Sequence, residues 1–203
     1  MQVNLENLGH TFTGKSWLFR NLNITLQPGE IYALTGPSGS GKSTLLSILA
    51  GWEKPSEGNV AKENVATIRW VFQNPQGSAK RTVEDHVMLP LLARGTPLRQ
   101  ARKETEELLE RFGLQPLKNQ AFKSLSGGER QRLMLARGLA TNPDLFLIDE
   151  PTAQLDLQTR IEVNQAIKNL VHPGSIVVIA THDEETKNSC TAHIDLRQQP
   201  KQP

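Results

Sequence analysis

The chain has 203 residues, of which 37% are hydrophobic, enough apolar side chain to fill the core of one large domain. Lys and Arg number 23 against 21 Asp and Glu, and the formal net charge of +2 does not indicate binding to nucleic acid or acidic lipid. The single cysteine excludes an internal disulfide and is typical of a reducing compartment. No apolar run approaches the roughly 20 residues of a membrane-spanning helix, so we expect a cytoplasmic protein.

The first clear element is a buried strand followed by a phosphate-binding loop. Residues 31–34 (IYAL) are apolar throughout, which is typical of a parallel strand covered on both faces. Residues 36–43 (GPSGSGKS) match the pattern GxxxxGK[ST], and residues 44–50 continue as a helix. The glycines let backbone N–H groups face a phosphate, Lys42 can reach the terminal phosphates, and Ser43 can ligate Mg²⁺. The sequence therefore predicts binding of a nucleoside triphosphate.

Residues 76–142 differ in character and predict a mostly helical lobe inserted into an α/β core made of residues 1–75 and 143–203. Between Leu98 and Phe112, apolar residues recur at helical spacing, and a glycine follows as the expected stop. We expect the core and the lobe to form one structural unit.

A further helix is predicted to begin at Ser126, with two glycines in its first turn. Ser126 and Glu129 have the spacing of a capping box, and apolar residues follow at core spacing. Gly127 and Gly128 would cost helix stability, which an ordinary helix start does not explain. Because glycines leave the first N–H groups accessible, we expect a second anion site here.

The next buried strand, residues 145–148 (LFLI), ends in two carboxylates. In phosphate-loop enzymes a carboxylate at this position holds Mg²⁺ through water, which suits Asp149. Glu150 can orient or deprotonate the attacking water, because its position still faces the crevice. The alternative is a solvated acidic turn before Pro151, which the phosphate loop elsewhere in the chain disfavours.

The third buried strand, residues 176–180 (IVVIA), leads to His182. His182 could contact the γ-phosphate, although an isolated histidine is more often structural and only its place at a strand end indicates otherwise. Ligands of open α/β folds bind outside the carboxyl ends of the strands. We therefore expect the three strand ends to converge on one site.

The motifs GPSGSGKST, VFQNP, LSGGE, LFLIDEPT and AQLD, with the late His182, resemble those of ATP-binding cassette (ABC) ATPases in order and spacing. The resemblance extends over essentially the whole chain. It implies an α/β phosphate-loop NTPase core with a small antiparallel β part and an inserted helical subdomain. It also implies an ATPase that binds Mg-ATP between two copies of itself and drives a separate transmembrane permease, with no nucleic acid as partner.

The resemblance implies roles for residues at matching positions. Gln73 in VFQNP is similar to the glutamine that senses Mg²⁺ and the γ-phosphate and links the site to the membrane partner. Ser126, Gly127 and Gly128 resemble the signature that closes over ATP on the opposite subunit. Asp156 resembles an aspartate that crosses the dimer interface. The expected ATP-binding residues are Phe12, Gly36, Pro37, Ser38, Gly39, Ser40, Gly41, Lys42, Ser43, Thr44, Ser126, Gly127, Gly128 and Asp156; the expected Mg²⁺ ligands are Ser43, Gln73 and Asp149; the expected catalytic residues are Glu150, His182 and Gln73.

An aromatic side chain that stacks on adenine is expected upstream of the phosphate loop. Phe12 fits best by its distance from the strand around residues 23–26, and Trp17 is the alternative. Either residue could instead be an ordinary core or surface aromatic.

Two features are similar to the lipoprotein-releasing, macrolide-export and cell-division ATPases: the sequence EPTAQLD, with Gln154 where many members have alanine, and RTVEDHVMLPLLARG in the helical lobe. This similarity implies an export or extraction complex, with the chain on the cytoplasmic face of the inner membrane. One alternative is a regulatory complex of the cell-division type that moves no solute. Another is a soluble relative of DNA repair or translation, which usually has a long coiled coil or a second cassette.

Two segments carry further expectations. Residues 51–73 are shorter than is usual in the family, which puts the completeness of the antiparallel β part in question. Residues 74–92 contain the apolar cluster Val87, Met88, Leu89, Leu91 and Leu92. We expect part of this segment to form a groove for a short cytoplasmic helix of the partner, although a purely internal role for the cluster is the alternative.

Overall fold

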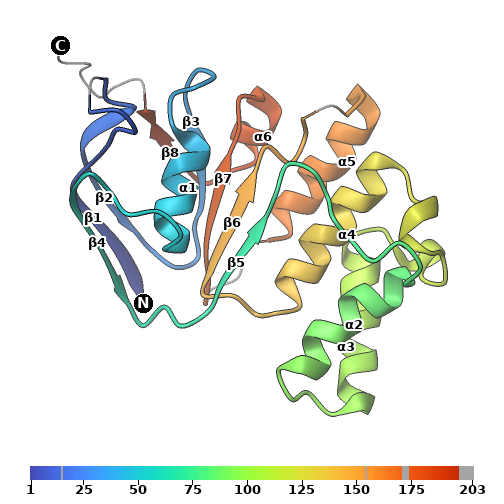
Figure 1. Cartoon of the computed structure of the whole chain (residues 1–203). Coiled ribbons are helices and arrows are strands. Elements are labelled where there is room, and N and C mark those ends of the chain that lie inside the picture. The colour runs from blue at the N-terminus through green and yellow to red at the C-terminus, as the bar shows by residue number, and fades with distance from the viewer. Residues whose placement is uncertain (15, 154, 171–173, 197–203) are drawn as a thin grey trace.

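The computed structural model describes residues 1–14, 16–153, 155–170 and 174–196 and contains two sheets and a group of helices (Figure 1). Gln154, on which part of the sequence argument rests, lies outside the described residues. A three-stranded antiparallel sheet has the order β2–β1–β4, with β1 Gln2–His10, β2 Phe19–Leu26 and β4 Glu57–Glu63. The shortened segment thus still supplies a strand to this sheet.

The second sheet is parallel and has the order β5–β6–β7–β3–β8. Its strands are β3 Ile31–Thr35, β5 Ile68–Val71, β6 Leu145–Asp149, β7 Ile176–Ala180 and β8 Ala192–Asp195. The three apolar runs expected as parallel strands are β3, β6 and β7, which lie side by side at the centre of the sheet.

Both faces of the central strands are covered, which explains why their sequences show no polar alternation. Leu145 and Leu147 of β6 pack in a core with α1 and the antiparallel sheet, whereas Phe146 and Ile148 face a second core formed with α2, α3, α4 and α5. In Figure 1, α1 lies between the two sheets, and α2 and α3 lie farthest from the antiparallel sheet. The helices are α1 Lys42–Ala50, α2 Val83–Ala93, α3 Leu98–Arg111, α4 Gly127–Leu139, α5 Leu157–Lys168 and α6 Glu184–Asn188.

Two helix boundaries can be compared with those that the sequence predicts. Helix α3 ends where Phe112 and then Gly113, with a φ of 65°, break the helical path. Helix α1 begins at Lys42, two residues before the expected start, because the left-handed Gly41 directly precedes it. Helices α2, α3 and α4 lie between β5 and β6 in the chain and share one hydrophobic core with α5 and the sheet, so lobe boundaries at 76 and 142 stay a prediction. Within the described residues, every helix is too short or too polar to span a bilayer.

Candidate nucleotide-binding site

A cavity opens where the central strands end. Its volume of about 720 Å³ is usual for small-molecule sites. The loop after β3, Gln73 after β5, Glu150 after β6 and His182 after β7 all line it. The expected convergence of the strand ends is therefore present. Of the predicted ATP-binding residues, Phe12 and residues 36–39 and 41–44 line the cavity, together with Leu18, which carries no sequence signal.

The phosphate loop owes its shape to its glycines. Gly39 and Gly41 have φ values of 75° and 93°, in the left-handed region that favours glycine. A Cβ on Gly36 would lie only 2.6 Å from Ser40 Oγ, and that hydroxyl is buried rather than part of the lining. Because Gly41 provides no side-chain cap, the first N–H groups of α1 have no side-chain acceptor at this end and can bind a phosphate.

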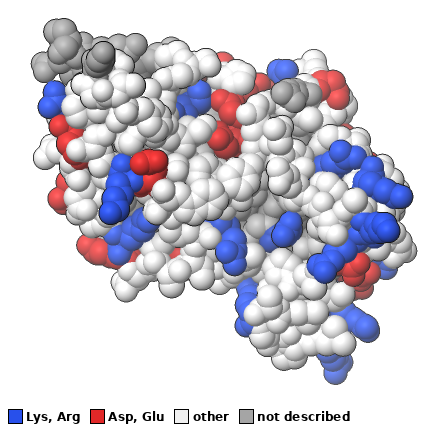
Figure 2. Space-filling model, viewed as in Figure 1, with Lys and Arg blue, Asp and Glu red and all other residues white. Residues whose placement is uncertain are grey.

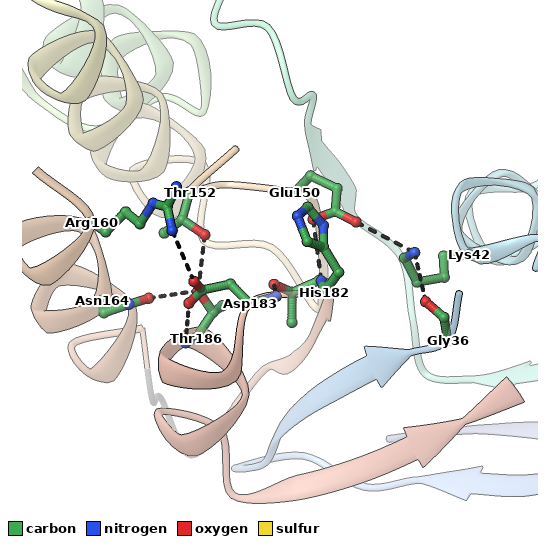
Figure 3. Close-up of polar contacts among 10 residues, drawn as sticks. Gly36, Lys42, Glu150, Thr152, Arg160, Asn164, His182, Asp183 and Thr186 are labelled. Carbon is green, nitrogen blue, oxygen red and sulfur yellow. Dashed lines mark hydrogen bonds and ion pairs between the residues drawn. The ribbon is translucent and has the colours of Figure 1, made fainter. Parts of the chain in front are cut away.

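Glu150 is held between a cation and an imidazole ring (Figure 3). Lys42 Nζ lies 3.4 Å from Glu150 Oε1 and donates to the Gly36 carbonyl at 3.1 Å. Glu150 Oε2 lies 2.7 Å from His182 Nδ1 and accepts from the His182 backbone N–H at 3.3 Å. Only 13% of the Glu150 side chain is exposed, against 68% for His182. The arrangement fixes a carboxylate at the wall of the cavity, where it can accept a proton from water.

The backbone at Glu150 adopts a conformation that is uncommon for a residue with a side chain. Its φ is 45°, and its N–H donates to the Ala180 carbonyl at 2.8 Å. Left-handed non-glycine residues cost free energy and persist where their surroundings enforce them, often at functional sites.

Asp149 and Ser43 fit a Mg²⁺ ion. Burial raises the pKa of Asp149, while a hydrogen bond from Ser43 and the charge of Lys42 oppose the rise. Asp149 Oδ1 is buried and has no hydrogen-bond partner in the described part of the chain. Carboxylate, hydroxyl and amide oxygens are the ligands of a hard cation, and Mg²⁺ usually combines few of them with phosphate oxygens. The described residues hold no group of three or more His, Cys, Asp or Glu suited to a metal.

The signature residues form a second group that does not line the cavity. Ser126 is the N-cap of α4 and exchanges the expected capping-box hydrogen bonds with Glu129. Ser126 and Gly127 are exposed, whereas Gly128 is buried against Thr159 of α5. Packing therefore gives one reason for a glycine at 128 that the sequence does not reveal.

Asp156 belongs to this second group. It is exposed and caps α5, because its carboxylate accepts from the backbone N–H of Thr159 at 3.0 Å and from the Thr159 hydroxyl at 2.6 Å. These hydrogen bonds, led by that of the hydroxyl, lower the pKa of Asp156. The structure thus brings Asp156 and Gly128 together through Thr159, away from the residues that line the cavity.

The two aromatic candidates differ in position. Phe12 is 69% exposed at the cavity, with its ring edge-to-face against His10 at a centroid distance of 4.7 Å. Trp17 is not among the lining residues, and its ring is covered by the Arg20 guanidinium at 4.5 Å. Phe12 is the one of the two that is available to stack on a base.

Comparisons of the sequence and of the structure with known proteins identify one and the same protein family. The ABC transporter family matches residues 19–153. The arginine transport ATP-binding protein ArtM of Bacillus subtilis is 37% identical over 195 residues, covering 89% of this chain and 81% of that protein. The lipoprotein-releasing system ATP-binding protein LolD 1 of Rhodopseudomonas palustris is 34% identical, covering 85% of this chain and 84% of that protein. The dimeric structure of the ATP-binding cassette MJ0796 bound to ADP and Pi has a TM-score of 0.78 and 33% identity, covering 96% of this chain and 94% of that chain. Other curated relatives are longer, and the chain spans between 31% and 58% of their length.

Proposed function

The chain belongs to the ATPase subunits of the ABC transporter family, and from this premise we propose that two copies bind Mg-ATP between them and drive a separate transmembrane permease. Binding and hydrolysis of ATP follow from the family. The shared site, the direction of transport and the partner are the parts that we propose.

One observation carries the shared site: a single chain presents its two sets of motif residues apart. Lys42 and Glu150 line the cavity, whereas Ser126 and Asp156 stand exposed at the N-termini of α4 and α5. A two-fold arrangement would bring the α4 N-terminus of one copy over the cavity of the other and create two identical composite sites. The dimeric state of MJ0796 supports this arrangement.

Within such a site each of the motif residues would have its own role. The phosphate loop and Lys42 would hold the phosphates, with Phe12 against adenine. Ser43, Asp149 and Gln73 would hold the Mg²⁺, which neutralises charge on the phosphates. Glu150 would take the proton of the attacking water, and His182, bound to it, would contact the γ-phosphate.

A groove of about 860 Å³ between β5 and α2 is the proposed docking site of the permease. It is lined by the arginines Arg69, Arg81, Arg94 and Arg137, and no Asp or Glu is among its lining residues. Figure 2 shows Lys and Arg gathered on the helical side of this face. A cytoplasmic helix with an apolar face and carboxylates would be complementary to the groove.

The residues around the groove also support its coupling to the nucleotide. Val87 and Leu91 are buried in the helical core, whereas Leu89 lines the groove and is 39% exposed, so part of the apolar cluster is internal and part is accessible to a partner. Gln73 lines the nucleotide cavity, and its chain neighbours Phe72 and Asn74 line the groove. Movement of Gln73 on binding of the γ-phosphate would therefore reach the groove directly.

The proposed direction is export or extraction at the cytoplasmic face of the membrane. The identity to LolD, over most of both chains, supports it. Import is a second candidate, because three of the longer relatives are import ATP-binding proteins by name. Co-purification from the native membrane and identification of the bound permease would separate these two, and would also reveal a regulatory partner that transports nothing.

Mixing two inactive variants tests the shared site. A Lys42→Ala chain keeps its signature, and a Ser126→Arg chain keeps its phosphate loop, so a mixed dimer would have one intact composite site. We expect ATPase activity to return on mixing and to rise with the fraction of mixed dimer. If no activity returns, crosslinking of cysteines introduced at positions 38 and 127 decides the matter, since failure to crosslink between copies in Mg-ATP would contradict the shared site.

A further inference from the structure

A buried network of polar side chains lies beside Glu150 and His182, the catalytic pair of the proposed function (Figure 3). Thr186 of α6 is fully buried, and its Oγ1 lies 3.0 Å from Thr152 Oγ1, 2.9 Å from Asp183 Oδ1 and 2.8 Å from Asn164 Oδ1. Thr152 and Asn164 are also buried, with 2% and 5% exposed. Buried hydroxyls that are fully hydrogen-bonded fix the segments that carry them.

The network joins three segments that are distant in the sequence. Thr152 lies in the turn after β6, two residues beyond Glu150, and Asp183 directly follows His182. Asn164 lies on α5. The Thr186 hydroxyl has a single proton, which it donates to Asp183 while it can accept from Thr152, so it ties the turn of Glu150 to the turn of His182. Asn164 Oδ1, 2.8 Å away, places α5 against the same hydroxyl.

A second link connects α5 to the Asp183 carboxylate. Arg160 of α5 donates from Nε to the Leu155 carbonyl at 2.9 Å, and its guanidinium lies 3.7 Å from Asp183 Oδ2. Burial alone would raise the pKa of Asp183, but hydrogen bonds from Thr186 and the charge of Arg160 hold it below its ordinary value. Asp183 is thus anionic and accepts from Thr186, whose hydroxyl can in turn accept from Thr152.

The catalytic pair needs such support. The left-handed backbone at Glu150 is unfavourable unless its neighbours enforce it. The 2.7 Å contact between Glu150 and His182 joins the same two turns that Thr186 bridges. Displacement of a catalytic group by about 1 Å can cost roughly 100-fold in rate.

We propose that Thr186 is a positioning residue for ATP hydrolysis, which holds Glu150 and His182 in their contact and makes them move with α5 and its N-cap Asp156. This inference rests on the proposed function, in which Glu150 is the base and Asp156 lies at the dimer interface. It gives a physical path by which the approach of a second copy at Asp156 reaches the catalytic pair.

The role of the Thr186 hydroxyl can be tested with two substitutions. Thr186→Val keeps the shape and removes the hydroxyl, whereas Thr186→Ser keeps the hydroxyl. We expect Thr186→Val to lower kcat for ATP at least about tenfold with KM changed less than about threefold. We expect Thr186→Ser to retain kcat within about threefold of the parent. Thermal unfolding measured alongside shows how much of each chain is folded.

The outcomes separate positioning from packing. A folded Thr186→Val chain with parental kcat, or a Thr186→Ser chain as slow as Thr186→Val, overturns the inference. If Thr186→Val does not fold, Thr152→Val removes the other hydroxyl of the bridge and is judged by the same kcat and KM criteria. A parallel Glu150→Gln chain distinguishes failure of the proposed function from failure of this inference. Normal turnover of Glu150→Gln contradicts the proposed base. An inactive Glu150→Gln chain together with an unaffected Thr186→Val chain contradicts only the positioning role.

Discussion

Gly128 of α4 packs directly on Thr159 of α5, and a Cβ added to Gly128 would lie 1.9 Å from Thr159 Cγ2. Thr159 is in turn bonded to Asp156 through its backbone and its hydroxyl. The N-termini of α4 and α5 therefore form one packed unit, in which a change at the signature glycine would displace the Asp156 cap.

The two signature glycines should respond differently to alanine. At Gly128 the added methyl group overlaps Thr159, and such overpacking typically costs about 1–3 kcal/mol. At Gly127 the nearest atom is 3.4 Å away, on Leu155, so Gly127→Ala should change the free energy of unfolding by less than about 1 kcal/mol. Urea unfolding of both variants measures the difference.

A double variant checks the cause. Thr159→Ser removes the overlapping Cγ2 and keeps the hydroxyl bonded to Asp156. In the Thr159→Ser background, Gly128→Ala should cost much less stability than in the parent. An equal cost in both backgrounds would show that the contact with Thr159 is not the reason for the glycine.

Lys42→Ala should abolish most nucleotide binding and turnover. Lys42 is nearly buried at the cavity, and a charge-assisted hydrogen bond to phosphate is worth about 1.5–3 kcal/mol, or roughly 10- to 150-fold in affinity. Calorimetric titration with Mg-ATP and steady-state ATPase assays measure both losses, with the exposed Lys54→Ala as a matched control. ATPase activity within a few-fold of the parent would be incompatible with the assigned phosphate loop.

Glu150→Gln should separate binding from hydrolysis. The amide keeps the shape but cannot take a proton, so turnover should fall by about 100-fold or more while ATP still binds. The variant should then accumulate as a dimer in Mg-ATP, measured by size-exclusion chromatography with light scattering. A variant that stays monomeric at high protein concentration, even with its permease present, would argue strongly against the shared site.

The sequence predicts the parallel core and the phosphate loop because both depend on local patterns. Unbroken apolar runs mark β3, β6 and β7, and the loop is a contiguous motif after the first of them. Contacts between distant segments leave no such pattern. Thr152 and Thr186 are 34 residues apart, and each resembles an ordinary polar residue in the sequence. The sequence around Gly128 likewise does not indicate that the methyl group of Thr159 packs against it. The second role of that glycine emerges only when α4 and α5 are placed together.

Stability should decrease below pH 6.5 because of His86. Its Nε2 accepts from the Ser78 N–H at 3.0 Å, so Nδ1 carries the proton and donates to the Thr82 carbonyl at 2.7 Å. Burial lowers the pKa of His86 below its ordinary value of 6.5, and the charges of Arg137 and Arg81 lower it further against the opposing effects of Thr82 and Asp85. The unfolded chain therefore binds a proton first as the pH falls, and stability is lost from 6.5 down to the lowered pKa.

His86→Gln keeps a donor and an acceptor but does not titrate. Urea unfolding on either side of pH 6.5 should show a smaller pH dependence in this variant than in the parent. The same slope in both chains would contradict the role given to His86.

Arg81→Glu should weaken assembly with the permease and leave the basal ATPase intact. Arg81 lines the groove, is exposed, and has no ion-pair partner among the described residues. A partner helix with carboxylates would then meet a like charge, and we expect binding to weaken at least about tenfold and more strongly at low salt.

The matched control is Arg99→Glu, the same reversal at an exposed position of α3 outside the groove lining. Complex recovery from native membranes and permease-stimulated ATPase activity measure the effect. Equal losses in both variants would indicate a general charge effect, and no loss in either would place the docking site elsewhere on the helical segment.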